Sequence, residues 1–188
     1  MYQICVSGSA KGETVEEGRK LAMELGEAIA KAGHHLITGA TVGLPNYAAE
    51  AYKKAGGKMS IGISPADSKI EHVMKYRLPT KAYDAIVYSG LHYVGRDVLL
   101  INTSDAVLSV GGRLGTLHEA IIAIETEKPI GFFIGSGGVS DYVDELIELG
   151  RPLREDTYIA VNESAEGLLR DMTKHLDDIN AKYKNLFH

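Results

Sequence analysis

The stretch Asp105-Ala-Val-Leu-Ser-Val-Gly-Gly-Arg-Leu-Gly-Thr-Leu-His-Glu119 decides the fold of this chain. It predicts a buried strand over residues 106–110, a glycine-rich turn over residues 111–115 and a helix that opens at Thr116. Glycines allow a sharp turn and a close approach of the backbone to a ligand. The helix start adds unpaired N–H groups and the positive end of the helix dipole, which suit an anion such as a phosphate. A turn that merely joins strand to helix has the same pattern, so both interpretations stay open for this stretch alone.

Glu119 falls within the first turn of the predicted helix. Its carboxylate matches the positive end of the helix dipole, but it would repel a phosphate at contact distance. We therefore expect a phosphate on the glycine turn and Glu119 beside a different part of the same ligand.

The rest of the chain alternates short apolar runs with amphipathic segments. The predicted strands cover residues 2–6, 36–38, 58–64, 85–88, 106–110, 130–134 and 158–161. The predicted helices cover residues 14–32, 45–55, 91–102, 116–125, 139–149 and 165–184, and a short helix and a loop are expected within residues 66–84. Thr14 with Glu17 predicts a capping box at the first helix.

Strands that are apolar on both faces and alternate with helices indicate a parallel sheet covered on both sides. We therefore predict an α/β fold with one domain over residues 1–188: a doubly wound, mainly parallel, Rossmann-like sheet of about seven strands with helices on both faces. In such sheets ligands bind beyond the carboxyl ends of the strands, where the winding reverses.

Small-residue turns follow three of the predicted strands, at residues 7–12, 39–43 and 111–115. All three are expected at the same edge of the sheet, where together they would form a site of nucleotide size. The residues predicted to bind the ligand and its phosphate are Gly8, Ser9, Thr38, Gly39, Gly43, Gly111, Gly112, Arg113, Gly115 and Thr116.

Composition and missing motifs narrow the choice of function. The chain has 188 residues, a net charge of −5 and no basic run, which argues against a nucleic-acid-binding face. The single Cys5, together with the lack of a signal-peptide pattern or a long apolar run, leads us to expect a cytoplasmic protein without membrane contact.

The seven histidines lack metal-ligand spacing, so neither a metal nor a cofactor is expected. No P-loop motif is present, and the second strand ends in Thr38-Gly39 rather than in an acid that could bind a ribose diol.

Several motifs resemble the Lonely Guy-like family of the SLOG superfamily, once described as lysine decarboxylases. The family pattern Pro-Gly-Gly-x-Gly-Thr-x-x-Glu corresponds to residues 111–119, and its upstream arginine corresponds to Arg96. Gly111 stands in place of the proline, Arg113 in place of the second glycine, and Asp97 in place of the lysine that often follows the arginine. From the sequence, Asp97 is expected to be a solvated helix residue and His118 a helix-surface residue.

The resemblance implies a phosphoribohydrolase, which cleaves the N-glycosidic bond of a nucleoside 5′-monophosphate to free base and ribose 5-phosphate. It implies a catalytic carboxylate at Glu119, a catalytic Arg96 that orients the phosphate or that carboxylate, and a homodimer or higher homo-oligomer. Two alternatives stay open: a module that binds or senses a nucleotide or another phosphorylated ligand without cleaving it, and a carrier of the molybdenum cofactor.

Overall fold

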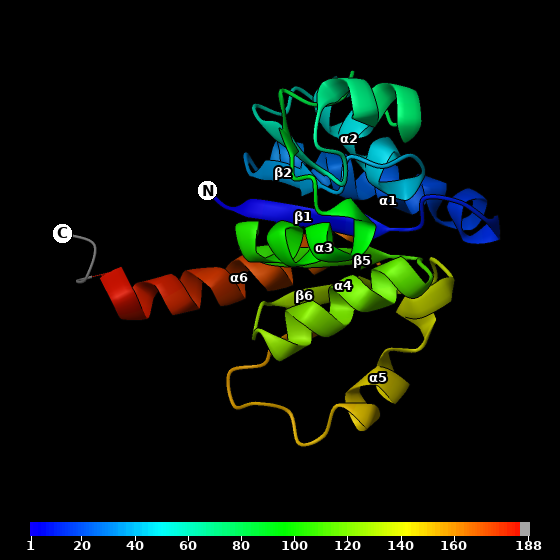
Figure 1. Ribbon diagram of the computed structural model, residues 1–188. Helices are drawn as coiled ribbons and strands as arrows, with labels where there is room; N and C mark the ends of the chain where they lie inside the picture. The colour runs from blue at the N-terminus through cyan, green and yellow to red at the C-terminus, as the bar shows by residue number, and fades with distance from the viewer. Residues whose placement is uncertain (185–188) are drawn as a thin grey trace.

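The protein folds around one parallel sheet in the computed structural model, which describes residues 1–184 (Figure 1). The sheet has the strand order β4-β3-β2-β1-β5-β6-β7, and every neighbouring pair is parallel. Its strands are β1 (Gln3–Gly8), β2 (His35–Thr38), β3 (Ser60–Ser64), β4 (Ala85–Tyr88), β5 (Ala106–Val110), β6 (Ile130–Phe133) and β7 (Ile159–Asn162). The predicted doubly wound, Rossmann-like α/β fold is confirmed, and the winding reverses between β1 and β5.

Helices cover both faces of the sheet. The α-helices are α1 (Glu13–Lys31), α2 (Leu44–Lys54), α3 (His92–Thr103), α4 (Leu114–Glu125), α5 (Val143–Leu149) and α6 (Ala165–Tyr183). A π-helical turn, η1 (Glu71–Lys75), lies within the loop predicted before β4. The single helix predicted over residues 139–149 is instead a 3₁₀ turn, η2 (Gly138–Asp141), followed by α5. No helix in residues 1–184 combines the length and hydropathy that a membrane span requires.

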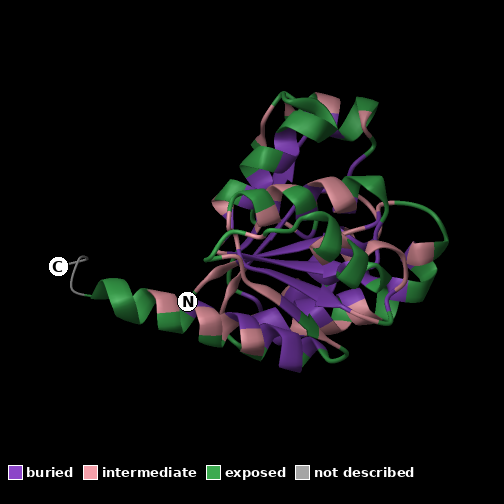
Figure 2. Ribbon diagram, turned by 90° about the horizontal axis from the view of Figure 1, so that it is seen from below, coloured by how far each residue is buried: buried purple, intermediate pink, exposed green. Residues whose placement is uncertain are grey.

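Two hydrophobic cores lie on opposite faces of the sheet, because successive side chains of a strand point to opposite sides. On β1, Ile4 and Val6 pack with α1, α2 and α6, whereas Cys5 packs with α3, α4 and α5. Figure 2 shows the result, in which buried strands lie between layers of helices with exposed outer surfaces. The sheet is therefore buried on both faces, and only the loops at its edges can form a site.

The start of α1 differs from the prediction. Gly12 precedes the helix without a side-chain cap, so the predicted capping box of Thr14 and Glu17 is wrong. The Thr14 hydroxyl instead lies 2.7 Å from the hydroxyl of Ser9, within the turn that follows β1. Thr14 thus fixes the shape of this turn.

Helices α1 and α2 approach each other closely at Gly26. A Cβ atom at Gly26 would overlap the backbone carbonyl of Ala48 on α2, so only glycine fits here without moving a helix.

We predict that Gly26→Ala lowers the free energy of unfolding by roughly 1–3 kcal/mol, because overpacking outweighs the better helix propensity of alanine. Thermal unfolding would measure this as a decrease in Tm of about 2–4 °C per kcal/mol. Lys20→Ala, at an exposed position of the same helix, serves as the control and should change stability by less than about 0.5 kcal/mol. Equal Tm values for both variants would contradict the close α1–α2 contact.

Candidate functional site

A cavity of about 350 Å³ opens at the carboxyl edge of the sheet, where β1 and β5 lie side by side. Its walls come from the turns after β1, β2 and β5, from α3 and from the first turn of α4. The three small-residue turns thus meet at one edge, as the sequence predicts. The lining residues include Lys11, Thr41, Tyr93, Arg96, Asp97 and Glu119.

Six of the ten residues predicted to bind the ligand line this cavity: Gly8, Ser9, Gly39, Arg113, Gly115 and Thr116. The other four do not line it, namely Thr38, Gly43, Gly111 and Gly112. Thr38 is fully buried and accepts a hydrogen bond from the backbone N–H of Ala40 at 3.1 Å, while its hydroxyl lies 2.8 Å from that of Tyr83. Thr38 therefore shapes the turn after β2 instead of facing a ligand.

The glycine turn after β5 is fixed by hydrogen bonds from the segment that follows β6. Gly111 and Gly112 have φ angles of +58° and +108°, a region that side chains disfavour. The N–H of Gly111 donates to the Ser136 hydroxyl at 2.6 Å, and the carbonyl of Gly112 accepts from the N–H of Val139 at 3.0 Å. These contacts fix the start of α4, whose unpaired N–H groups border the cavity. Arg113 extends from this turn toward the β1–α1 turn, where its Nη1 atom lies next to Gly12.

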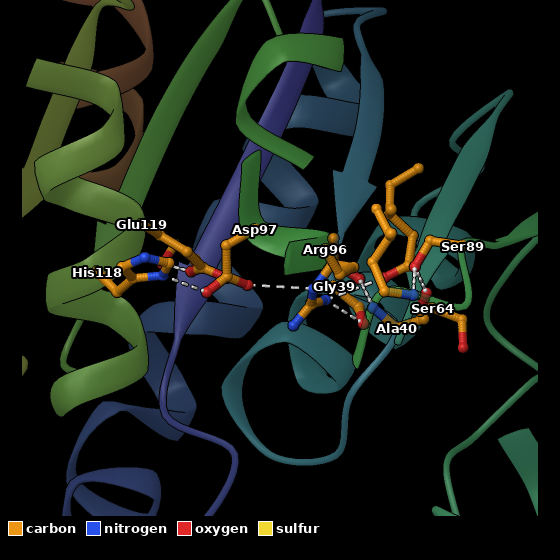
Figure 3. Close-up of polar contacts among 12 residues, drawn as sticks. Gly39, Ala40, Ser64, Ser89, Arg96, Asp97, His118 and Glu119 are labelled. Carbon is orange, nitrogen blue, oxygen red and sulfur yellow. Dashed lines mark hydrogen bonds and ion pairs between the residues drawn. The ribbon is translucent and has the colours of Figure 1, made fainter. Parts of the chain in front are cut away.

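Arg96 lies in α3 and is almost fully buried. Its Nη1 donates to two backbone carbonyls, that of Gly39 after β2 and that of Ile63 on β3, the latter at 3.0 Å (Figure 3). Its Nε lies 3.2 Å from a carboxylate oxygen of Asp97, close enough for an ion pair although not aligned as a hydrogen bond. Arg96 therefore connects α3 to the ends of β2 and β3, and it also lines the cavity.

Asp97 is not the solvated helix residue that the sequence predicts. It is 4% exposed, lines the cavity, contacts Arg96 and His118, and lies beside Glu119 (Figure 3). The Nδ1 atom of His118 lies 2.7 Å from the second Asp97 oxygen, which ties α4 to α3 (Figure 3). The expectation failed because α3 packs against both the sheet and α4, so adjacent residues of one helix are both buried. His118 is half-buried, and it does not line the cavity.

Glu119 is 8% exposed and faces the cavity from α4. It accepts a hydrogen bond from the hydroxyl of Ser7 on β1, a partner that the sequence did not indicate. Burial raises the pKa of Glu119 to about 7; the Asp97 carboxylate acts in the same direction, whereas Arg96 and the Ser7 hydroxyl act against it. Near neutral pH, this carboxyl is therefore present in both its protonated and its ionised form.

The charged side chains around the cavity favour an anion. Within residues 1–184, no three His, Cys, Asp or Glu side chains gather in a way that could hold a metal ion. The charges at the cavity instead suit an anion: Lys11, Arg96 and Arg113 are opposed by Asp97 and, when ionised, by Glu119.

We predict that the pH dependence of stability reflects the raised pKa of Glu119. Its pKa of about 7 exceeds the ordinary value of 4.5, so its contribution to stability is fully present below pH 4.5 and is lost as pH rises through 7. Glu119→Gln removes this titration. The Tm of the variant should therefore rise relative to wild type, by several degrees, between pH 5 and pH 8.

Thermal unfolding at the two pH values measures this difference. Glu125→Gln makes the same chemical change at an exposed position of the same helix and should follow wild type. A Glu119→Gln variant that parallels wild type at both pH values would show that Glu119 is ionised throughout.

Known proteins share this fold and sequence pattern. A sequence profile of the SLOG cluster4 family matches residues 1–168. An uncharacterised protein from Archaeoglobus fulgidus is 33% identical over 130 residues, which cover 69% of this chain and 78% of that protein.

Among solved structures, TM1055 superimposes with a TM-score of 0.78 at 25% identity, over 93% of this chain and 99% of that one. The molybdenum cofactor carrier protein of Chlamydomonas reinhardtii superimposes with a TM-score of 0.74 at 27% identity, over 93% and 98% of the two chains. These matches confirm the predicted membership in the SLOG superfamily and support a ligand-binding module. The chain belongs to the SLOG cluster4 family.

Proposed function

We propose that this protein binds a small phosphorylated ligand, a nucleotide or a molecule of similar size, and releases it intact. The phosphate would lie at the start of α4, on the N–H groups of the turn that contains Gly115 and on the hydroxyl of Thr116. Thr116 is 3% exposed and lines the cavity, so its side chain lies at the proposed phosphate position before a ligand arrives. The cations Lys11 and Arg113 border the same space and would add charge-assisted hydrogen bonds.

The burial of Glu119 is the observation that favours binding over cleavage. Hydrolysis of an N-glycosidic bond passes through a cationic transition state, which an ionised carboxylate stabilises best. In this cavity burial raises the pKa of Glu119 to about 7, so much of the protein carries a neutral carboxyl at neutral pH. Arg96, the other residue expected to be catalytic, has Nη1 hydrogen-bonded to two backbone carbonyls. Glu119 and Arg96 therefore both make hydrogen bonds within the protein, in the positions from which they would have to act on a substrate.

The charge of the cavity supports a phosphorylated ligand more strongly than the net charge of the chain suggests. Below the pKa of Glu119, the cavity holds three cations, Lys11, Arg96 and Arg113, against the single anion Asp97. This local excess suits a phosphate dianion even though the whole chain carries −5. The Chlamydomonas relative is described as a molybdenum cofactor carrier, and a comparable cargo is one form of this proposal.

Phosphoribohydrolase activity is the second candidate. Glu119 lies in the cavity beside the expected phosphate position, and a carboxyl with a pKa near the working pH is suited to general acid–base catalysis. In that case Glu119 would activate the attacking water, and the product would be ribose 5-phosphate.

One experiment separates the two candidates. The purified protein is incubated with nucleoside 5′-monophosphates, and free base is measured by chromatography while ligand-dependent stabilisation is measured by thermal unfolding. Stabilisation without free base supports the binding function. Free base that disappears in Glu119→Gln would establish the hydrolase and overturn our first proposal, and the absence of both signals would reject both candidates.

We predict that Thr116→Val raises the Kd for the stabilising nucleotide roughly tenfold or more, because one hydrogen bond to a charged phosphate is lost. Isothermal titration calorimetry measures the change. Thr126→Val is the matched control. Thr126 lies just past the far end of α4, and its hydroxyl donates a hydrogen bond to the Ile122 carbonyl at 2.7 Å. An unchanged Kd in Thr116→Val would exclude the start of α4 as the phosphate site.

We infer that a second copy of this chain covers α3. Apolar side chains are exposed on α3 at Val94 and Val98, with 69% and 46% exposure, and at Leu91 just before the helix, with 50%. Val87 of β4 and Met74 of η1 are exposed as well. Two identical faces of this kind can pair about a twofold axis.

We predict that Val94→Asp shifts the protein from dimer to monomer in size-exclusion chromatography with light scattering, because the charge would be buried in the interface. Leu149→Asp places the same charge at another exposed apolar position, 83% exposed on α5, and should leave the dimer intact. A wild-type protein that elutes as a monomer would contradict the inference directly.

A further inference from the structure

The side chains of Asp97 and Glu119 lie side by side inside the protein, and both residues line the cavity (Figure 3). They are 4% and 8% exposed, so water screens their charges poorly. Two carboxylates placed side by side cannot both be ionised without a large cost, and one proton shared between them removes that cost. The position of this proton decides the charge that a ligand meets.

The neighbours of each carboxyl differ, and they favour the charge on Asp97. One Asp97 oxygen lies 3.2 Å from Nε of Arg96, and the other lies 2.7 Å from Nδ1 of His118. Glu119 has a neutral partner, the hydroxyl of Ser7. A cation and a second nitrogen donor stabilise a carboxylate better than a hydroxyl does.

We propose that Asp97 is a positioning residue that keeps a proton on Glu119, and that it thereby makes the affinity for a phosphorylated ligand dependent on pH. This inference rests on the proposed ligand-binding function. With Glu119 protonated, the cavity contains one carboxylate. As pH rises and Glu119 ionises, a second negative charge appears beside the ligand and repels it.

All charged and titratable groups around Glu119 enter this balance. The thiol of Cys5 lies on β1, and burial raises its pKa well above the ordinary value, so it stays neutral. The remaining groups are Arg96 and Asp97 on α3, His118 on α4, and Lys11, Tyr93 and Arg113 at the rim of the cavity. Burial has the largest effect on the pKa of Glu119 and raises it, and Arg96 lowers it; of the charged groups, Asp97 is the anion whose charge raises this pKa further.

Carbon-13 NMR of the side-chain carboxyls tests the role of Asp97 without any need for activity. In wild type, the Glu119 signal should titrate with a midpoint near pH 7. In Asp97→Asn, the midpoint should fall by about one pH unit or more, because the neighbouring negative charge is gone.

Asp105→Asn is the matched control. It removes the same charge at the amino end of β5, where the carboxylate accepts the N–H of Gln3 at 2.7 Å, far from the carboxyl edge. It should leave the Glu119 midpoint unchanged. A midpoint that stays near 7 in Asp97→Asn would overturn the proposal.

A second measurement applies if Asp97→Asn does not fold. In wild type, the Asp97 carboxyl carbon should show an inflection at the same pH as Glu119, because a charge that appears on Glu119 changes the electrostatic environment of its neighbour. An Asp97 signal without an inflection at that pH would also overturn the proposal.

Ligand binding then tests the consequence. The Kd of adenosine 5′-monophosphate for wild type should rise on the order of tenfold between pH 6.5 and pH 8.5, relative to the Kd for Asp97→Asn. The comparison between the two proteins cancels the titration of the phosphate itself. Parallel pH profiles would overturn the coupling. If wild type does not bind the nucleotide at any pH, the proposed function fails, while the carboxyl titration still decides whether Asp97 holds the proton.

Discussion

The buried guanidinium of Arg96 is the constraint on which the site depends. A cation inside a protein requires partners, because its desolvation costs several kcal/mol. Arg96 finds them in the carbonyls of Gly39 and Ile63 and in the carboxylate of Asp97. Any side chain at residue 39 would overlap the guanidinium, so the glycine of this turn and the arginine of α3 require each other. The same contacts fix the edge of the sheet at which the cavity opens.

A chain of contacts leads from Arg96 to the ligand site. Nε of Arg96 lies 3.2 Å from Asp97. Burial raises the pKa of Glu119, the Asp97 carboxylate adds to this rise, and Arg96 acts against it. A buried Glu119 does little for stability near neutral pH and is better explained by function, because functional groups are often retained at a cost to the folded state. The cavity that results has cations at its rim and the carboxyl of Glu119 in its wall, which is the arrangement that our proposed phosphate site requires.

The architecture was predictable because its signals are local and repeat along the chain. Apolar runs such as residues 106–110 fixed the strands, and the glycines of residues 111–115 marked the turn at which the ligand edge begins. The placement of Arg96 and Glu119 in one cavity followed from motif order. These features need only the order of elements and the geometry of a parallel sheet.

The failures concern contacts between distant elements. Neighbouring helix residues point about 100° apart, so an inward Arg96 suggested an outward Asp97, and only the packing of α4 against α3 buries both. Thr38 and Thr14 looked suited to a ligand and to a helix cap, yet they bond Tyr83 and Ser9 from other parts of the chain. No local pattern in the sequence encodes these partners.

The most direct test of the central claim is an amide NMR titration with a nucleoside 5′-monophosphate, followed in parallel by phosphorus-31 spectra. We expect the largest shift changes at the N–H groups of Gly115 and Thr116, and a phosphorus signal that stays that of an intact nucleotide. Shift changes centred elsewhere on the chain, or a growing ribose 5-phosphate signal, would contradict this expectation.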